Sequence, residues 1–403
     1  MALPATMSAL AAQVGCTRYP VRWDELYKDL LTDLARSGNP YTDPGYYARL
    51  HAEYGILPNY LQLYQGAALA IGQDPELSAF LYILCRMLEQ SENHRADMAD
   101  FTWPVFDGDF AKNMLCGLAA ASETVLCYNK LIKRNLPEHV MKQVLQAPEF
   151  GITFFKLRHN GEPGYNLLYW YQLAIDCKLF RIGRLEYELF AKFAGHACIF
   201  ENSEGSRATL AQELDLHVSG HAYGSPGYED TDGRWTATIT ETDEHWIGHP
   251  FNEDGSVSHE AIQLSKSDWK KIISYGDPVI SVHIPAGGGL TEEAVERSLT
   301  DAKAFFAQYF PDYDYRCFVC YSWLMDPQLV TMLGRDCNIA KFNLRFTKLT
   351  QKSSGTGVFT FVFLKPDTSF DLQTLPENTK LEQELKAHYL SGKYIYELMG
   401  YFT

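Results

Sequence analysis

Two apolar runs separated by a long amphipathic segment, in residues 278–324, limit the fold more than any other feature of this sequence. PVISVHIP at 278–285 and YRCFVCYSWL at 315–324 are short and rich in β-branched, aromatic and other apolar residues, as buried strands are. Between them, EEAVERSLTDAKAFFAQYF at 292–310 repeats apolar residues every three or four positions and stops at Pro311. A strand, a helix and a second buried strand predict a right-handed βαβ unit whose two strands are parallel.

Three consecutive glycines, Gly287, Gly288 and Gly289, lie between the first strand and the helix. In a βαβ unit, ligands bind off the carboxyl ends of the strands, where a helix N-terminus offers unpaired N–H groups and glycine lets the backbone approach a phosphate closely. The spacing is neither GxGxxG nor GxxxxGK[ST], so it supports neither a Rossmann nor a Walker site. The alternative is a tight turn with Thr291 as the helix N-cap, since Glu292 in the first helical turn would repel a phosphate.

The chain has 403 residues, which is too long for one ordinary core, and its first part has a helical pattern. Asp74-Pro75 marks a helix start, and the apolar residues after it recur at the spacing of one helix face: Leu77, Phe80, Leu81, Leu84 and Leu88. A long segment over 110–132 carries a second stripe with this period, made of Phe110, Met114, Leu118, Ala121, Val125, Tyr128 and Ile132. Residues 1–148 are therefore predicted to form an α-helical N-terminal domain.

After Gly151 the pattern changes to short strands separated by turn signals. ITFFKLRH at 152–159 is β-branched and aromatic, and RLEYELF at 184–190 alternates apolar with polar residues, which is typical of a strand with one wet face. Three shorter strand candidates follow: HACIFEN at 196–202, ELDLHVS at 213–219 and RWTATIT at 234–240. This part of the chain is predicted to be mostly antiparallel sheet.

The C-terminal part continues after the βαβ unit with a short helix, PQLVTML at 327–333, and a predicted closing hairpin. The hairpin would join FNLRFTKL at 342–349 to GVFTFVF at 357–363. The predicted fold class is thus α+β, with a helical domain followed by a mixed sheet with flanking helices. We place the second domain at 149–403, divided into a strand-rich part, 149–277, and a βαβ-containing half, 278–403.

Charge and composition exclude several classes of partner. Fifty acidic against 35 basic side chains give a formal charge of −15, which would repel nucleic acid and anionic membranes. No stretch approaches the roughly 18 consecutive apolar residues that span a bilayer, and the first residues lack the basic region of a signal peptide. Nine cysteines without regular spacing suit reduced thiols, so we expect a cytoplasmic protein.

The order strand, IPAGGGL, long helix, YRCFVCYSWL, DPQLVTML resembles the acyl-CoA-binding half of the GNAT acyltransferases. In that family the turn between strand and helix carries [QR]-x-x-G-x-[GA], whose backbone amides hold the CoA pyrophosphate. Gly287 and Gly289 match the small positions, whereas Ile284 replaces the Gln or Arg. HIPAGGGL, FFAQYFP, CYSWLMDPQL and NIAKFNLRF more specifically resemble a bacterial group of GNAT-like acyltransferase-domain proteins with an α-helical N-terminal domain.

This resemblance implies acetyl-CoA or another acyl-CoA as co-substrate, a small-molecule acceptor and no metal. It implies CoA contacts at Ala286, Gly287, Gly288, Gly289 and Leu290. The function it implies is an acyl-CoA-dependent N-acyltransferase acting on an amine or a similar nucleophile. The alternative is a non-catalytic protein on the same fold that binds a small molecule or carbohydrate, because residues 220–251 interleave Trp, Tyr, His and Asp.

His283 is the candidate general base. Strand alternation places His283 on one face with Ser281, nearest the glycine turn, and the resemblance places this strand beside the reaction centre. A neutral imidazole there could take a proton from an attacking ammonium. We expect Ser322 and Asp326, after the neighbouring strand, to orient the imidazole or to protonate the leaving thiolate. The alternatives are a structural histidine and, for Asp326 before Pro327, a helix N-cap.

Two further motifs point to structure more than to chemistry. His217 and His221 have an i, i+4 spacing, but their segment has the pattern of a strand entering a Gly-rich loop, which does not favour zinc. Cys317 and Cys320 form a single CxxC inside a predicted buried strand, so we interpret them as core cysteines.

Overall fold

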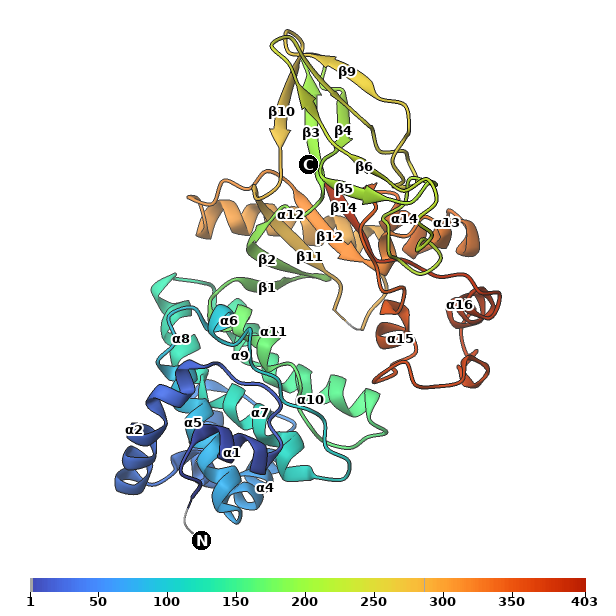
Figure 1. Cartoon of the computed structure of the whole chain (residues 1–403). Coiled ribbons are helices and arrows are strands. Elements are labelled where there is room, and N and C mark those ends of the chain that lie inside the picture. Colours follow the sequence, from blue (N-terminus) through green and yellow to red (C-terminus); the bar gives the residue numbers. More distant parts are fainter. Residues whose placement is uncertain (1–2, 286) are drawn as a thin grey trace. The chain divides into compact units, whose positions relative to one another are not determined.

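The chain folds into two compact units, Met1–Arg181 and Ile182–Thr403, in a computed structural model that describes residues 3–285 and 287–403 (Figure 1). The first unit is helical, and the second combines sheets with flanking helices. This is the α+β class predicted from the sequence.

The first unit is built from short and medium-length helices. They are α1 (Met7–Val14), α2 (Arg22–Ser37), η1 (Pro40–Thr42), α3 (Pro44–Tyr54), α4 (Leu61–Gly72), α5 (Pro75–Glu89), α6 (His94–Asp97), α7 (Phe110–Ser122), α8 (Thr124–Lys133), α9 (Glu138–Leu145), α10 (Ala147–Arg158) and α11 (Leu168–Ile175). Helix α5 packs against α1, α2, α4 and α7, and its predicted apolar stripe is buried throughout. Asp74 caps α5 by accepting from the amide of Leu77, with Pro75 in the first turn.

The predicted stripe over 110–132 is interrupted at Glu123, where α7 ends and α8 begins. Two hydroxyls bend back here: Ser122 Oγ donates to the carbonyl of Ala119 and Thr124 Oγ1 donates to that of Ala121, both at 2.7 Å. Such local bonds compete with the helical ladder. As a result Val125, at 40% exposure, lies outside the core.

The strand predicted at 152–159 is wrong, because this segment lies in helix α10. Gly151, Ile152 and Phe155 are buried, which is the spacing of one helix face. Gly151 is required by packing, since a Cβ at this position would lie 2.2 Å from the ring of Tyr165. The β-branched and aromatic composition of this short run favours a strand, whereas the spacing of its buried residues is that of a helix.

The second unit contains a central sheet, smaller sheets and five α-helices among its described residues. Its strands are β1 (Leu179–Ile182), β2 (Leu185–Lys192), β3 (Ala197–Asn202), β4 (Arg207–Ala211), β5 (Leu214–Leu216), β6 (Trp235–Ala237), β7 (Thr240–Glu241), β8 (His245–Gly248), β9 (Ile262–Ser265), β10 (Trp269–Ile273), β11 (Pro278–His283), β12 (Phe318–Ser322), β13 (Thr347–Leu349) and β14 (Leu398–Phe402), the first of which begins before the division between the units. Its helices are α12 (Glu292–Tyr309), η2 (Trp323–Met325), α13 (Gln328–Leu333), α14 (Asn338–Asn343), α15 (Gly357–Phe361), η3 (Leu372–Thr374) and α16 (Lys380–Leu390).

The central sheet has the strand order β1-β2-β11-β12-β14-β13. Strands β11 and β12 are parallel and are joined through α12, which confirms the predicted βαβ unit. The strands on either side of this pair, β2 and β14, run antiparallel to it. Helix α12 covers one face of this sheet, where Phe306 packs edge-on against Tyr187 of β2 with ring centroids 5.7 Å apart (Figure 1). The alternation predicted for β2 holds, since Leu185, Tyr187 and Leu189 are buried.

The opposite face of the sheet is covered at one end by the three-stranded sheet β10-β3-β4. Its core joins Ile199 of β3 to Val319, Met399 and Leu349 of the central sheet. The predicted core cysteines are confirmed: Cys317 and Cys320 are 1% and 0% exposed, and burial raises the pKa of both thiols to about 12.

The predicted closing hairpin is wrong, because its second arm is helix α15 and β13 pairs with β14. Glu397 provides the physical reason: its Oε1 accepts the amide of Gly357 at 2.5 Å and its Oε2 accepts that of Gly355 at 3.3 Å. A carboxylate on the first amide of a helix stabilises the turn that opens it. The antiparallel partner of β12 is therefore β14, from far along the chain.

Candidate active site

The centre of the candidate site is the point where β11 and β12 end. Among the described residues, the parallel ladder joins Ile280 to Phe318 and Ser281 to Val319, while β11 continues to His283 and β12 to Ser322. Ile280 is fully buried on the α12 side, whereas Ser281 and His283 are partly exposed on the other side. The predicted alternation along β11 is therefore present.

His283 lies beside two carboxylates of the neighbouring strand β2. Its Nε2 is 3.1 Å from Oε2 of Glu188, and Glu186 is directly opposite it in the antiparallel register. The His283 side chain is 28% exposed and that of Glu188 is 19% exposed, so both side chains are mostly buried but still accessible to solvent. If Nε2 donates to Glu188, Nδ1 of the imidazole is left as the basic nitrogen.

Ser322 and Asp326 are engaged in local structure at the end of β12. Ser322 Oγ accepts the amide of Leu324 at 3.1 Å, as the N-cap of η2. Asp326 is 2% exposed and accepts from the amides of Gln328 at 2.9 Å and Tyr396 at 2.8 Å. Burial raises the pKa of Asp326 to about 6, although these bonds act in the opposite direction.

Alternation along β12 places Tyr321, not Ser322, on the face that carries His283. Val319 is opposite Ser281 in the parallel ladder, and Tyr321 follows it by two residues on the same face. Tyr321 is 50% exposed. The carboxylate that lies within hydrogen-bond distance of His283 is that of Glu188, not that of Asp326. A chemical role for Ser322 or Asp326 therefore stays a prediction.

The glycine loop after β11 has the left-handed backbone that only glycine adopts readily. Gly287 and Gly288 have φ of 86° and 70°, and among the described residues other than its chain neighbours no atom lies within 4 Å of where a Cβ of Gly287 would be. Ala286 lies outside the described residues. Thr291 is the N-cap of α12, as predicted, because its Oγ1 accepts the amide of Ala294 at 3.3 Å. The loop therefore presents open backbone immediately before a helix N-terminus.

The two acidic residues in the first turn of α12 are paired with cations. Glu292 lies 3.3 Å from Lys341 and 3.8 Å from Arg345, and Glu293 lies 2.7 Å from Arg297. These exposed pairs contribute little stability, but they offset the negative charge that would otherwise repel an anion at this helix start.

Three side chains near the site were not singled out from the sequence: Glu188, Arg184 and Lys341. The alternation at 184–190 predicts that Arg184, Glu186 and Glu188 lie on the polar face of a strand. It does not predict that β11 is the neighbouring strand. Arg184 bonds to the glycine loop, whose carbonyls at Pro285, Gly288 and Gly289 accept from its guanidinium.

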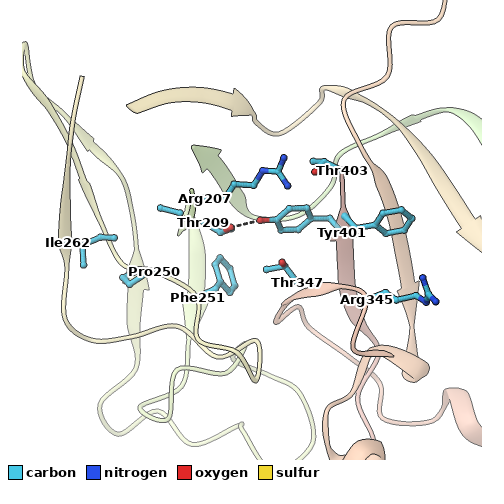
Figure 2. A pocket seen from close by; sticks show the side chains of 11 residues that line it. Arg207, Thr209, Pro250, Phe251, Ile262, Arg345, Thr347, Tyr401 and Thr403 are labelled. Atoms are coloured by element: carbon cyan, nitrogen blue, oxygen red, sulfur yellow. Dashed lines mark hydrogen bonds between the residues drawn. The ribbon is translucent and has the colours of Figure 1, made fainter. Parts of the chain in front are cut away.

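A separate cavity of about 460 Å³ lies between β4, the segment at Pro250 and Phe251, and the ends of β13 and β14 (Figure 2). Tyr401 and Thr209 share a hydrogen bond of 2.6 Å in its wall (Figure 2). Both arginines in its wall form salt bridges: Arg207 with Glu201 at 2.9 Å, and Arg345 with Glu296 and Glu292. The described residues that line it include no histidine, aspartate or glutamate, so we place the chemistry at the strand ends instead.

The other sequence motifs give no metal centre in the described part of the chain. His217 and His221 each place Nδ1 near Ser219 Oγ, at 2.8 and 3.2 Å, and no group of three or more His, Cys, Asp or Glu there could hold a metal ion. None of the described helices is both long and apolar enough to cross a membrane.

The sequence model of the family described as "GNAT-like C-terminal domain" matches residues 179–402, and the chain belongs to this family. No curated protein sequence matches the chain.

Solved structures show the same fold over almost the whole chain. An acyltransferase in complex with decanoyl-CoA and teicoplanin is 18% identical, with 98% of each chain covered and a TM-score of 0.62. An acyltransferase in complex with CoA and 10C-teicoplanin is also 18% identical, with 98% of each chain covered and a TM-score of 0.63. At this identity the likeness concerns the fold.

Proposed function

We propose that this protein transfers an acyl group from acyl-CoA to the amine of a small molecule. The observation that carries the proposal is the combination of family membership with an open glycine loop and a histidine–carboxylate pair at one end of the βαβ unit. Acyltransferases of the same fold have been solved in complex with CoA, with decanoyl-CoA, and with decanoyl-CoA and teicoplanin, which supports a CoA thioester and a small-molecule partner here.

The CoA pyrophosphate would bind the backbone of residues 286–290. The left-handed Gly287 and Gly288 keep side chains away from the main chain of this turn, which would let its amides contact a phosphate, and the N-terminus of α12 would add a favourable dipole. The open space around Gly287 leaves room for the ligand to touch the main chain. The thioester would then lie toward the ends of β11 and β12.

Chemistry at this point requires a free amine, a carbonyl in reach and a proton acceptor. His283 would take one proton from the acceptor's ammonium, and the freed nitrogen lone pair would form a C–N bond to the thioester carbonyl. The C–S bond then breaks and the CoA thiolate takes a proton from a hydroxyl group to leave as the thiol, while the second proton of the nitrogen returns to that hydroxyl and leaves a neutral amide. Tyr321 and Ser322 are the hydroxyl groups at the end of β12 from which that proton could come.

Glu188 and Glu186 define what this site would accept. Glu188 fixes the tautomer and orientation of the imidazole, and the two carboxylates give the face a negative potential. That potential would attract a cationic amine and stabilise the imidazolium formed when His283 takes the proton. An amine acceptor therefore fits this face better than an acidic one.

The test measures CoA release from acyl-CoA with amine acceptors over a range of pH, for the parent, His283→Gln and Glu188→Gln. A base role predicts that His283→Gln loses about 10²- to 10⁴-fold in rate and loses the acid limb of the profile. His139→Gln, an exposed histidine of α9, is the matched control. Binding of CoA with no transfer to any amine, or binding of oligosaccharides alone, would instead indicate a non-catalytic binding protein.

A further inference from the structure

We propose that Arg184 is a positioning residue for the CoA pyrophosphate: it holds the carbonyls of the glycine loop on one side so that the loop amides face the ligand. The inference rests on the proposed function. It assigns to a residue of the β1–β2 turn a role in a site that lies about a hundred residues further along the chain.

The guanidinium of Arg184 spans both ends of the loop. Nη1 donates to the carbonyl of Pro285 at 2.9 Å, Nη2 to that of Gly288 at 3.2 Å, and Nε to that of Gly289 at 3.2 Å. Arginine presents its donors in one rigid plane, so a single side chain can join three carbonyls that face it. Gly183 beside it, with φ of 60°, makes the tight turn that brings this side chain to the loop.

The direction of the loop carbonyls determines the direction in which the next amide N–H groups point. In a trans peptide, the N–H of one residue points away from the carbonyl of the residue before it. Because the carbonyl of Gly288 points at Arg184, the N–H of Gly289 points away from it. The carbonyl of Gly289 fixes the N–H of Leu290 in the same way, so two amides face the side opposite the guanidinium.

Arg184 also supplies the positive charge that the loop itself lacks. Position 284, where related turns carry a Gln or Arg, is an isoleucine here, and residues 284–290 contain no basic side chain. A guanidinium behind the peptide groups adds positive potential on the side where a diphosphate would approach. The nearby carboxylate of Glu292 is already paired with Lys341 and Arg345, so it does not cancel this charge fully.

The test separates the pyrophosphate from the rest of CoA. For the full chain with Arg184→Gln and Arg184→Lys, we would measure CoA affinity by calorimetry and kcat/KM for two substrates with the same acyl group, acyl-CoA and acyl-pantetheine. We expect Arg184→Gln to weaken CoA binding and kcat/KM for acyl-CoA by about 10- to 100-fold, the range for lost charge-assisted hydrogen bonds. The kcat at saturating acyl-CoA and the rate with acyl-pantetheine should stay within a factor of about three, since neither depends on the pyrophosphate.

Arg184→Lys should show an intermediate loss, because lysine keeps the charge but cannot join three carbonyls. Arg316→Gln is the matched control: Arg316 is an exposed arginine just before β12, away from the glycine loop, and it is paired with Asp314. Equal losses with both substrates would make Arg184 merely structural and overturn the inference, as would unchanged CoA affinity in a folded variant. If the parent itself fails to bind CoA, the proposed function fails and takes this inference with it. If Arg184→Gln does not fold, the same comparison of substrates with Arg184→Lys decides the question.

Discussion

Glu123, between α7 and α8, has a carboxyl group that the helical unit buries completely, and replacing it with glutamine should stabilise the protein more as the pH rises. Glu123 is 0% exposed. Its Oε2 accepts from Nε2 of Gln172 at 2.9 Å, while Oε1 has no hydrogen-bond partner among the described residues. Burial raises the pKa of Glu123 to about 8, although the bond from Gln172 and the charge of Lys130 act in the opposite direction.

The magnitude follows from proton linkage. The unfolded chain binds this proton with a pKa near 4.5 and the folded chain with a pKa of about 8, so between these values the folded state holds one more proton. In that window the free energy of unfolding falls by about 1.4 kcal/mol per pH unit, and above it this loss stops growing. The total is on the order of 5 kcal/mol, of which about 3 kcal/mol is lost by pH 7.

Glu123→Gln removes the titration while keeping the shape. A glutamine can accept from Gln172 through its oxygen and offers an N–H where the protonated acid offers an O–H. The free energy of unfolding of the variant should therefore match that of the parent near pH 5 and exceed it progressively up to about pH 8. Chemical denaturation of the full chain at several pH values measures this gap, and hydrogen exchange of α8 and α11 shows whether it arises in the helical unit.

The control is Glu162→Gln, which removes an exposed carboxyl group from a turn of the same unit. Its gap to the parent should stay within about 0.5 kcal/mol at every pH. A Glu123→Gln gap that does not change between pH 5 and 8, or a variant that is less stable throughout, would refute the account of a buried acid kept protonated.

Three further changes test other contacts. Gly287→Val should abolish CoA binding detectable by calorimetry while leaving the melting temperature within a few degrees, because its φ of 86° disfavours a side chain at an open, exposed turn; unchanged binding would make the loop a structural turn only. Gly151→Ala should destabilise the chain by about 1–3 kcal/mol in denaturation, since its Cβ would meet the Tyr165 ring at 2.2 Å; a neutral result would mean that α10 can shift. Tyr401→Phe should cost about 1–2 kcal/mol by removing the 2.6 Å bond to buried Thr209, and Tyr275→Phe, at a ring that is 70% exposed, should cost nothing measurable.

The sequence was most informative where periodicity ran long enough to exceed local propensity. Helices α5 and α12 and the strands β2 and β11 were predicted with the correct faces, because each repeats apolar residues at its own period over several turns or pleats. Strand β12 was predicted from a continuous apolar run, which locates the strand but does not assign its faces. The secondary structure of two short aromatic segments was predicted wrongly. The segments at 152–159 and 357–363 have strand-like composition, but side-chain bonds and packing from far along the chain made both helical.

The candidate site was predictable along a strand and unpredictable across strands. Alternation within β11 was enough to place His283 on the partly exposed face, and the three glycines were enough to predict a turn between β11 and α12. The partner of His283 depends on which strand lies beside β11 and in which register, and neither is determined by the period of either strand. The same holds for Arg184, whose bonds to the loop arise only when the β1–β2 turn is brought to it.

A β-bulge in β2 decides that carboxylates, and not apolar side chains, accompany His283. The register pairs Val279 with Ala191, then shifts by one residue, so that Ser281 faces Glu188 and His283 faces Glu186. Phe190 sits at the shift with φ of 60°, a left-handed value that a bulky residue rarely adopts. Without the extra residue, Ser281 would face Leu189 and His283 would face Tyr187, and the two glutamates would point into the apolar layer under α12. A one-residue slip of this kind exchanges the two faces of a strand, so the strain at Phe190 is what allows one strand to supply both a buried core and the acidic partners of the candidate base.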